Sequence, residues 1–172
     1  MESDRDYWKE KYKTEWKPGT NRVRHVLEVL RERFPSLTIE PTKYALREDY
    51  IPPDERHKKH DPNILVKHQN TIICDIEVTG SYIEMMPPKI IFILKGKQIA
   101  AQERKREQEI DTWFYTVYRN SEYVLDLDLV EKFDADKARV KYLKGVPESY
   151  IEIPCAQAYP KEKLFEWIEQ KT

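Results

Sequence analysis

The chain has 172 residues, which is enough for one domain with a full hydrophobic core. Its 30 basic and 31 acidic side chains give a formal net charge of −1, so no overall positive field draws the protein to a polyanion, and a nucleic-acid site would have to be a local patch. Charged residues make up 35% of the sequence and only 4 positions are glycine, a composition that fits an ordered chain rich in surface ion pairs and is typical of thermophile proteins.

The sequence also bears on where the protein works. Its first residues, MESDRDYWKEKYK, are charged throughout and lack the apolar segment of a signal peptide. No apolar run approaches the roughly 20 residues that span a bilayer. Cys74 and Cys155 lie in separate apolar runs without Cys or His at ligand spacing, which favours buried free thiols in a reducing compartment. We therefore expect a soluble cytoplasmic protein with no membrane contact.

Residues 1–17 are polar with aromatic side chains at helical spacing, which favours an N-terminal arm or helix. Pro18 and Gly19 are expected to break the chain there, so we treat residues 18–172 as a single domain. Apolar residues then recur at helical spacing and predict an amphipathic helix over residues 21–34, with a core stripe of Val23, Leu27, Leu30 and Phe34. A strand over 38–45 and a polar surface loop over 46–60 are expected to follow.

The segment DPNILVKHQNTIICDIEVTGS, residues 61–81, predicts two strands, over 63–67 and 71–79, joined by a short turn. Side chains alternate across a strand, so one face of the second strand is wholly apolar and belongs in the core (Ile72, Cys74, Ile76, Val78). The other face carries Ile73, Asp75, Glu77 and Thr79. Adjacent carboxylates repel each other, and they are tolerated where water or a cation lies between them.

The C-terminal half predicts further strands and two helices. Residues 89–94, KIIFIL, form a continuous apolar run that favours a strand buried on both faces. A charged helix over 98–109 with a small apolar face at Ile99 and Ala100 follows. Strands are expected over 112–119, 123–130 and 149–153, and a closing helix begins near Pro160 and includes 164–168. Asp126 and Asp128 alternate with leucines, which fits the polar face of an edge strand. This order predicts an α/β or α+β domain with a central mixed sheet.

Two short motifs carry a resemblance to a known family. Asp61–Pro62 precedes the first of the two strands, and Glu77–Val78–Thr79 ends the second. This arrangement resembles the PD-(D/E)XK nuclease superfamily, which includes restriction endonucleases, archaeal Holliday-junction resolvases and viral nucleases. The resemblance covers about residues 20–130, and the usual Pro-Asp pair stands here as Asp-Pro. It implies a restriction-endonuclease-like core, in which a helix packs on a mixed sheet with a metal site at one edge.

The resemblance implies a ligand set. Asp61 and Glu77 would bind Mg²⁺ or Mn²⁺, and the carbonyl of Val78 would be a further ligand. The ion would polarise the scissile phosphate and lower the pKa of the attacking water. The sequence departs from the family at Thr79, where a lysine usually orients that water. Threonine offers a hydrogen bond but no positive charge.

Two replacements for the missing lysine stay open. A lysine could reach in from the next elements, with Lys97 favoured, Lys95 close behind it and Lys89 as a further candidate. Alternatively, Asp75 and Glu77 could act together as a pair of acids, as in some restriction enzymes that lack the lysine. If neither holds, the site is inactive.

The resulting hypothesis is a metal-dependent DNA endonuclease that acts as a homodimer, because cutting both strands takes two sites. The rival is a non-catalytic protein that keeps the nuclease-like fold and binds nucleic acid or another partner, which the near-neutral net charge and Thr79 favour. A third alternative is an unrelated α+β scaffold. Residues 56–60, RHKKH, could grip phosphate beside the site or form a solvated loop, and residues 102–107, QERKRE, are expected to be a solvated helix face.

Overall fold

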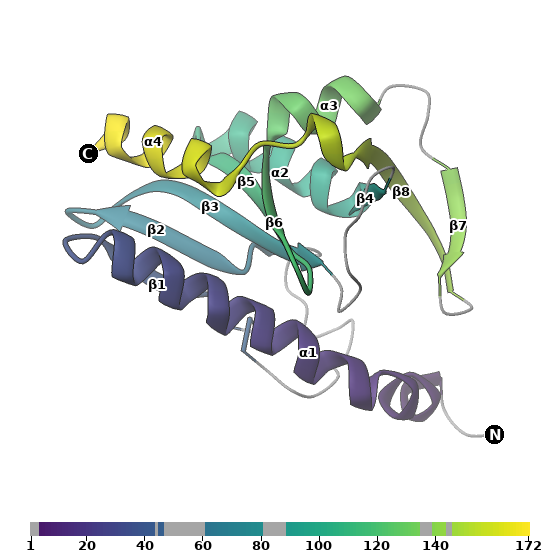
Figure 1. Cartoon of the computed structure of the whole chain (residues 1–172). Helices are drawn as coiled ribbons and strands as arrows, with labels where there is room; N and C mark the ends of the chain where they lie inside the picture. Colours follow the sequence, from purple (N-terminus) through teal and green to yellow (C-terminus); the bar gives the residue numbers. More distant parts are fainter. Residues whose placement is uncertain (1–3, 44, 47–60, 81–88, 135–138, 144–145) are drawn as a thin grey trace.

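The structure of this protein is a computed structural model that describes residues 4–43, 45–46, 61–80, 89–134, 139–143 and 146–172, with side chains for all of these except 4–18 and 139–148. A mixed sheet of five strands forms the centre, and helices cover both of its faces (Figure 1). The predicted α+β architecture with a central mixed sheet is confirmed.

The elements follow one another along the chain in this order: α1 (Asp4–Arg33), β1 (Thr38–Pro41), β2 (Ile64–His68), β3 (Thr71–Gly80), β4 (Ile90–Leu94), α2 (Lys95–Gln108), β5 (Asp111–Val117), β6 (Glu122–Asp126), α3 (Leu127–Asp134), β7 (Arg139–Leu143), β8 (Val146–Pro154), the 3-10 helix η2 (Cys155–Gln157) and α4 (Lys161–Lys171). None of the helices in the described ranges combines the length and apolar character that crossing a bilayer requires.

The five-stranded sheet has the order β1-β2-β3-β5-β6. Strands β3 and β5 are parallel, joined by a crossover through β4 and α2, and the other neighbours are antiparallel. The predicted hairpin of β2 and β3 is confirmed, and its two turn residues, Gln69 and Asn70, have positive φ as such tight turns require. Glycine is required at Gly80, whose φ is 132° and where a Cβ would lie 1.9 Å from the carbonyl oxygen of Val117.

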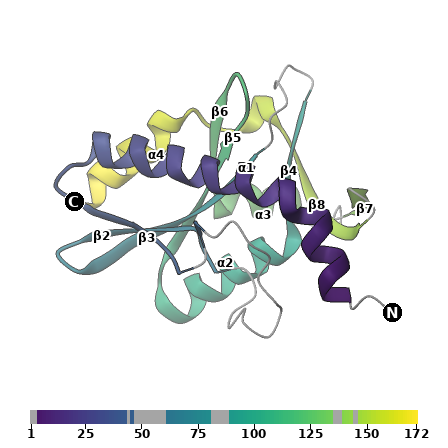
Figure 2. The same ribbon diagram turned by 90° about the horizontal axis from the view of Figure 1, so that it is seen from below.

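One face of this sheet is covered by α1 and α4, which lie alongside each other (Figure 2). Val26 and Leu30 of α1 and Ile168 of α4 are fully buried against the sheet. Directly after the end of α1, the ring of Phe34 packs edge to face on that of Phe165 in α4, at 5.8 Å between centroids. The apolar stripe predicted for residues 21–34 and the closing helix near Pro160 are both confirmed.

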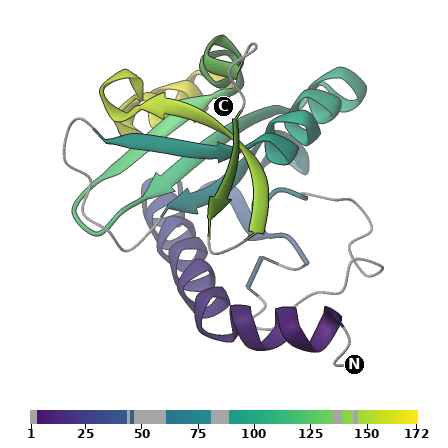
Figure 3. The same ribbon diagram turned by 90° about the vertical axis from the view of Figure 1, so that its right-hand side faces the viewer.

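The opposite face is covered by α2, α3 and a second sheet of order β4-β8-β7, which lies nearest the viewer in Figure 3. Ile91 and Ile93 of β4 face Ile151 and Ile153 of β8 in register and are buried with Phe114 of β5. The sequence did not predict this second sheet, and β7 was missed altogether.

The N-terminal helix is longer than predicted. It runs without interruption from Asp4 to Arg33, so the expected break at Pro18 and Gly19 is wrong. A proline inside a helix removes one hydrogen bond and bends the axis, but the flanking turns can remain helical. Figure 3 shows that α1 changes direction in its N-terminal part.

Two predictions about the segment before β5 are wrong. Strand β4 is buried on one face only: Ile91 and Ile93 are buried, whereas Ile90 on the other face is 39% exposed. Helix α2 begins three residues earlier than predicted, and the small apolar face at Ile99 and Ala100 does not form. Ile99 is 44% exposed, whereas Ala101 is buried in the apolar cluster with Ile91 and Ile93 and the buried Gln98 donates to Asp134.

The predicted strand over residues 123–130 is two elements. Strand β6 ends at Asp126 and helix α3 begins at Leu127. The Asp126 carboxylate accepts a hydrogen bond from the N–H of Leu129 at 2.8 Å, which is how an aspartate caps the start of a helix. The alternation of leucine and aspartate therefore does not continue along an edge strand, and Asp128 lies in the first turn of α3.

Candidate active site

The acidic face of β3 is buried under α2. Cys74, Ile76 and Val78 point to the core beneath α1, as the alternation predicts, and Asp75 and Glu77 point to the other side. Ile73 departs from the prediction, because a register shift leaves it without a partner on β2 and it packs with the apolar residues instead. Asp75 and Glu77 are both fully buried, so the acids are not an exposed strand end.

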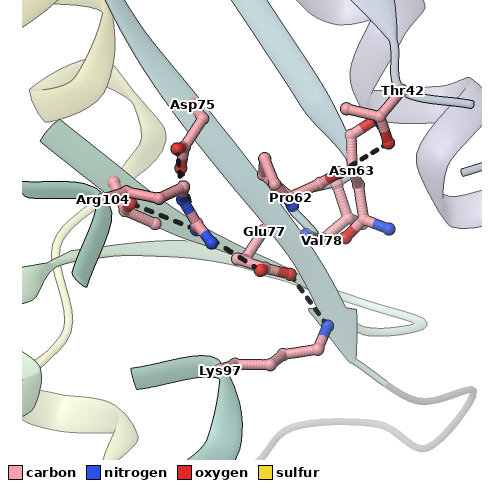
Figure 4. Close-up of polar contacts among 9 residues, drawn as sticks. Thr42, Pro62, Asn63, Asp75, Glu77, Val78, Lys97 and Arg104 are labelled. Carbon is pink, nitrogen blue, oxygen red and sulfur yellow. Dashed lines mark hydrogen bonds and ion pairs between the residues drawn. The ribbon is translucent and has the colours of Figure 1, made fainter. Parts of the chain in front are cut away.

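Helix α2 supplies two cations to these acids. Lys97 and Arg104 are separated by two helical turns, so they lie on the same side of α2, together with buried Ala101. The earlier cation pairs with the later acid: Lys97 Nζ lies 3.0 Å from Glu77 Oε2, and Arg104 reaches Asp75 (Figure 4). The four side chains form a neutral cluster of two acids and two bases between β3 and α2.

Arg104 makes the larger number of contacts in this cluster. Its Nε lies 2.7 Å from Asp75 Oδ2 and its Nη2 lies 3.3 Å from Asp75 Oδ1, so both oxygens of that carboxylate accept from one guanidinium. Nη2 also lies 3.4 Å from the hydroxyl of Thr112 and 3.6 Å from Glu77 Oε1. The side chain of Arg104 is 13% exposed, so the prediction of a solvated face for residues 102–107 is wrong at this position.

Glu77 is held less tightly than Asp75. Both of its oxygens are buried and make ion pairs, with Lys97 at 3.0 Å and with Arg104 at 3.6 Å, rather than hydrogen bonds of good geometry. Burial raises the pKa of Glu77, and the charges of Lys97 and Arg104 oppose that rise. Burial likewise raises the pKa of Asp75 against the effect of Arg104. A buried carboxylate that lacks hydrogen bonds is the kind of group that a further ligand can satisfy.

The segment before β2 is anchored beside this part of β3. The N–H of Asn63 donates to the carbonyl of Ile76 at 3.0 Å, and the side-chain oxygen of Asn63 accepts from the N–H of Val78 at 2.7 Å. The hydroxyl of Thr42 donates to the carbonyl of Pro62 at 2.6 Å (Figure 4). Asn63 and Thr42 were not singled out from the sequence, because a side chain that bonds to a neighbouring strand leaves no periodic signal.

This anchoring brings the start of the hairpin to the C-terminal half of β3. Asp61, two residues before Asn63, is exposed. Thr79 lies in β3, two residues after Glu77, is partly buried and pairs with Thr116 of β5. Within the described residues, no three His, Cys, Asp or Glu side chains gather as a metal-binding group, so the ligand set expected from the sequence rests on two acids and a carbonyl.

The other candidate lysines lie elsewhere. Lys95 forms an ion pair with Asp134 of α3, which also accepts a hydrogen bond from Gln98. Lys89 is exposed just before β4, and its carbonyl accepts from the N–H of Cys155. Of the three candidates, Lys97 is the one that pairs with Glu77. Residues 56–60 lie outside the described part of the chain.

The donor atoms present are compatible with a divalent cation. Glu77 contributes buried oxygens without hydrogen bonds, Asp61 an exposed carboxylate and Val78 a main-chain carbonyl. Such oxygen donors suit Mg²⁺ or Mn²⁺, which also bind water and phosphate oxygens. The types of donor atom therefore match the metal that the sequence resemblance implies.

Comparison with known proteins rests on structure. No protein-family model and no curated protein sequence matches the chain. Among solved structures, Archaeoglobus fulgidus Hjc, a Holliday junction resolvase from an archaeal hyperthermophile, matches with a TM-score of 0.53 and 11% identity, over 85% of this chain and 98% of that one. A nuclease from a fusselovirus matches with a TM-score of 0.52 and 13% identity, over 88% of each chain.

These matches, with the order of helix, hairpin and crossover around Glu77, define the fold class. The chain shares the restriction-endonuclease-like fold of these two structures, so the fold that the sequence resemblance implied is confirmed.

Proposed function

We propose that this protein is a metal-dependent endonuclease that hydrolyses phosphodiester bonds in DNA. The observation that carries the proposal is the pairing of Glu77 with Lys97. A buried carboxylate whose oxygens lack hydrogen bonds faces an ammonium at 3.0 Å, although the position that usually holds the motif lysine is Thr79. The restriction-endonuclease-like fold supports the same class of reaction, because two solved structures that share it are named a Holliday junction resolvase and a nuclease.

Each residue of the site has a role in this proposal. Asp61 and Glu77, with the carbonyl of Val78, hold Mg²⁺ or Mn²⁺. The ion supplies Lewis acidity and a water of lowered pKa when bound. The ammonium of Lys97 donates a hydrogen bond to the attacking water or to a phosphate oxygen and offsets the negative charge that develops there.

The remaining acid and the threonine have supporting roles. Asp75 assists by keeping Arg104 beside Glu77, since the guanidinium contacts both carboxylates. The hydroxyl of Thr79, two residues along β3 from Glu77, positions a water by hydrogen bonding. We infer that the protein acts in the cytoplasm, where the buried thiols of Cys74 and Cys155 remain reduced, and that it works as a homodimer because cleavage of both strands takes two sites.

A second function is favoured by a different feature of the same cluster. The charges of Asp75 and Glu77 are already balanced by Arg104 and Lys97, and the motif lysine is replaced by Thr79. An inactive protein of this fold would keep such a cluster as a structural ion-pair network and would bind nucleic acid, or another partner, without cutting it.

Cleavage assays decide between the two. Supercoiled plasmid and a four-way DNA junction are incubated with the wild type in Mg²⁺, in Mn²⁺ and in EDTA, beside E77Q and the control E103Q, which neutralises an exposed acid of α2. The nuclease requires cutting that depends on the metal, disappears in E77Q and persists in E103Q. A folded wild type that binds these DNAs and cuts neither, nor an RNA of similar form, would establish the binding function instead.

A further inference from the structure

Two acids that look equivalent in the sequence have unequal surroundings in the structure. Asp75 and Glu77 lie on one face of β3, two residues apart and equally buried. Both oxygens of Asp75 accept hydrogen bonds from Arg104, whereas Glu77 makes two single ion pairs, with Lys97 at 3.0 Å on one oxygen and with Arg104 at 3.6 Å on the other. A carboxylate whose two oxygens are both engaged by one guanidinium is a poor ligand for a cation, and Glu77, which lacks such a two-point contact, is the better one.

The placement of Arg104 explains this difference. Its guanidinium lies closer to Asp75, at 2.7 Å, than to Glu77, at 3.6 Å, and a bond toward Thr112 fixes its plane from a third side. Thr112 is itself buried and lies opposite Asp75 in the parallel pairing of β3 with β5. The guanidinium of Arg104, which comes from α2, is therefore held in place by Asp75 of β3 and Thr112 of β5.

We propose that Arg104 is a positioning residue of the candidate active site: it holds Asp75 out of the ligand set and leaves Glu77 as the acid of β3 that faces a cation. This inference rests on the proposed function. Arginine suits the task because its planar fork engages both oxygens of a carboxylate and keeps its charge at any pH at which the protein is folded. A lysine has one donor nitrogen and cannot hold both oxygens in the same way.

The test measures binding of Mn²⁺ to the full-length, metal-free chain, by the loss of the electron paramagnetic resonance signal of free Mn²⁺, without DNA. R104Q frees Asp75 to bind the ion, so we expect the affinity for Mn²⁺ to rise about tenfold, because affinity for such cations follows the number of charged ligands. The same variant should lose cleavage activity, since the ion is no longer held at Glu77 alone. A purely structural role would lower affinity and activity together.

Two further variants separate the release of Asp75 from a simple change of charge. In the double variant R104Q/D75N the freed acid is gone, so the affinity should return to within about twofold of wild type, as expected when one cation and one acid are removed together. The control R106Q removes a positive charge from the same helix at a side chain that is 70% exposed, and its affinity should stay near that of wild type. Circular dichroism confirms that each variant is folded.

Each outcome has a distinct meaning. A gain in R104Q that persists in R104Q/D75N, or no gain in a folded R104Q, overturns the proposal. If the wild type binds no Mn²⁺ but R104Q does so through Asp75, Glu77 is not the acid that faces a cation, and both the metal-dependent function and this proposal are overturned. Should R104Q fail to fold, R104K keeps the charge balance but not the fork, and it should give a smaller gain that D75N also abolishes; no gain in R104K would then overturn the proposal.

Discussion

Lys97 and Glu77 meet across two elements: the ammonium at the start of α2 lies 3.0 Å from a carboxylate in the middle of β3. If this pair is the centre of the reaction, K97A should lower the rate of DNA cleavage by about 100- to 10,000-fold, the range over which positioned proton-transfer groups act. Lys95 provides the matched control, because its partner is Asp134 rather than Glu77. K95Q should cleave at nearly the wild-type rate in the same plasmid assay, and equal losses in both variants would exclude a specific role for Lys97.

Thr79 offers a rescue experiment. It occupies the position at which the resembling family places its lysine, on the same face of β3 as Glu77. Adding T79K to the inactive K97A chain returns an ammonium to the neighbourhood of the Glu77 carboxylate. We expect K97A/T79K to cleave DNA at least about tenfold faster than K97A, because a positioned ammonium would restore part of the lost rate. T71K, which adds a lysine at the exposed start of β3, is the control, and equal recovery in both would show that position does not matter.

The charged form of Glu77, which the proposed reaction needs, should lower the stability of the fold. Its pKa is raised by burial, so the charged form is less favourable in the folded chain than in the unfolded one. The contribution of this group to the free energy of unfolding is therefore largest at low pH and falls as pH rises above the ordinary glutamate value of about 4.3.

E77Q removes the decrease in the free energy of unfolding that the Glu77 carboxyl causes as pH rises. Urea unfolding should show E77Q gaining stability relative to wild type as pH rises above the ordinary glutamate value of about 4.3, while cleavage falls at least about 100-fold, since even residues that only support a metal ligand cost up to that much. E103Q, at an exposed position, should show neither change. An E77Q chain that is less stable than wild type at the higher pH would contradict this expectation.

Asp126 should matter to stability and not to cleavage. Its carboxylate caps α3 through the N–H of Leu129, at 2.8 Å. D126A should lower the free energy of unfolding by about 1 kcal/mol, the usual cost of losing such a cap, whereas D126N should retain most of it. Chemical denaturation measures both, with D128A, at an exposed position, as the control. An unchanged midpoint in D126A would show that the bond contributes nothing in solution.

Glu122 should make the fold sensitive to acid. It lines a cleft of about 500 Å³ between α1, the β5–β6 turn and the start of α4, on the side of the sheet away from Glu77. Burial alone would raise the pKa of Glu122, but its bonds to His25 and Lys161 outweigh burial and lower that pKa. Tyr115 also donates to this carboxylate, at 3.2 Å.

A lowered pKa fixes the sign of the effect. The stability that Glu122 contributes is complete above the ordinary glutamate value of about 4.3 and is lost as pH falls below it through the value in the folded chain. E122Q should be less stable than wild type near neutral pH and should lose less on acidification. Urea unfolding across this range tests the point, and parallel losses in both chains would contradict it.

Much of the fold could be predicted from local patterns. The stripe of Val23, Leu27 and Leu30 fixed the core side of α1, and the alternation along β3 from Cys74 onward fixed which residues face it. The turn at Gln69 and Asn70 separated β2 from β3. These features depend on side-chain period and turn chemistry within a few residues, which is why a single sequence contains them.

Other features depend on contacts between distant segments. The leucine and aspartate alternation around Asp126 fits a strand, and it became a helix cap because α3 buries Leu129 and Val130 against β8. Helix α1 continues through Pro18, which local rules interpret as a break, and β4 finds its partner β8 far along the chain. Tertiary packing overrode local preference at each of these points.

The site shows the same division. By itself the sequence determined that Asp75 and Glu77 share a face of one strand, that Asp61 precedes the strand paired with it, and that a lysine is missing at Thr79. Only the tertiary structure decided which cation meets which acid. Lys97 and Arg104 both lie on α2. The packing of that helix on β3 places the guanidinium of Arg104 against Asp75 and the ammonium of Lys97 beside Glu77. Periodicity specifies the side of an element on which a residue lies, but the partner it meets there depends on how two elements pack.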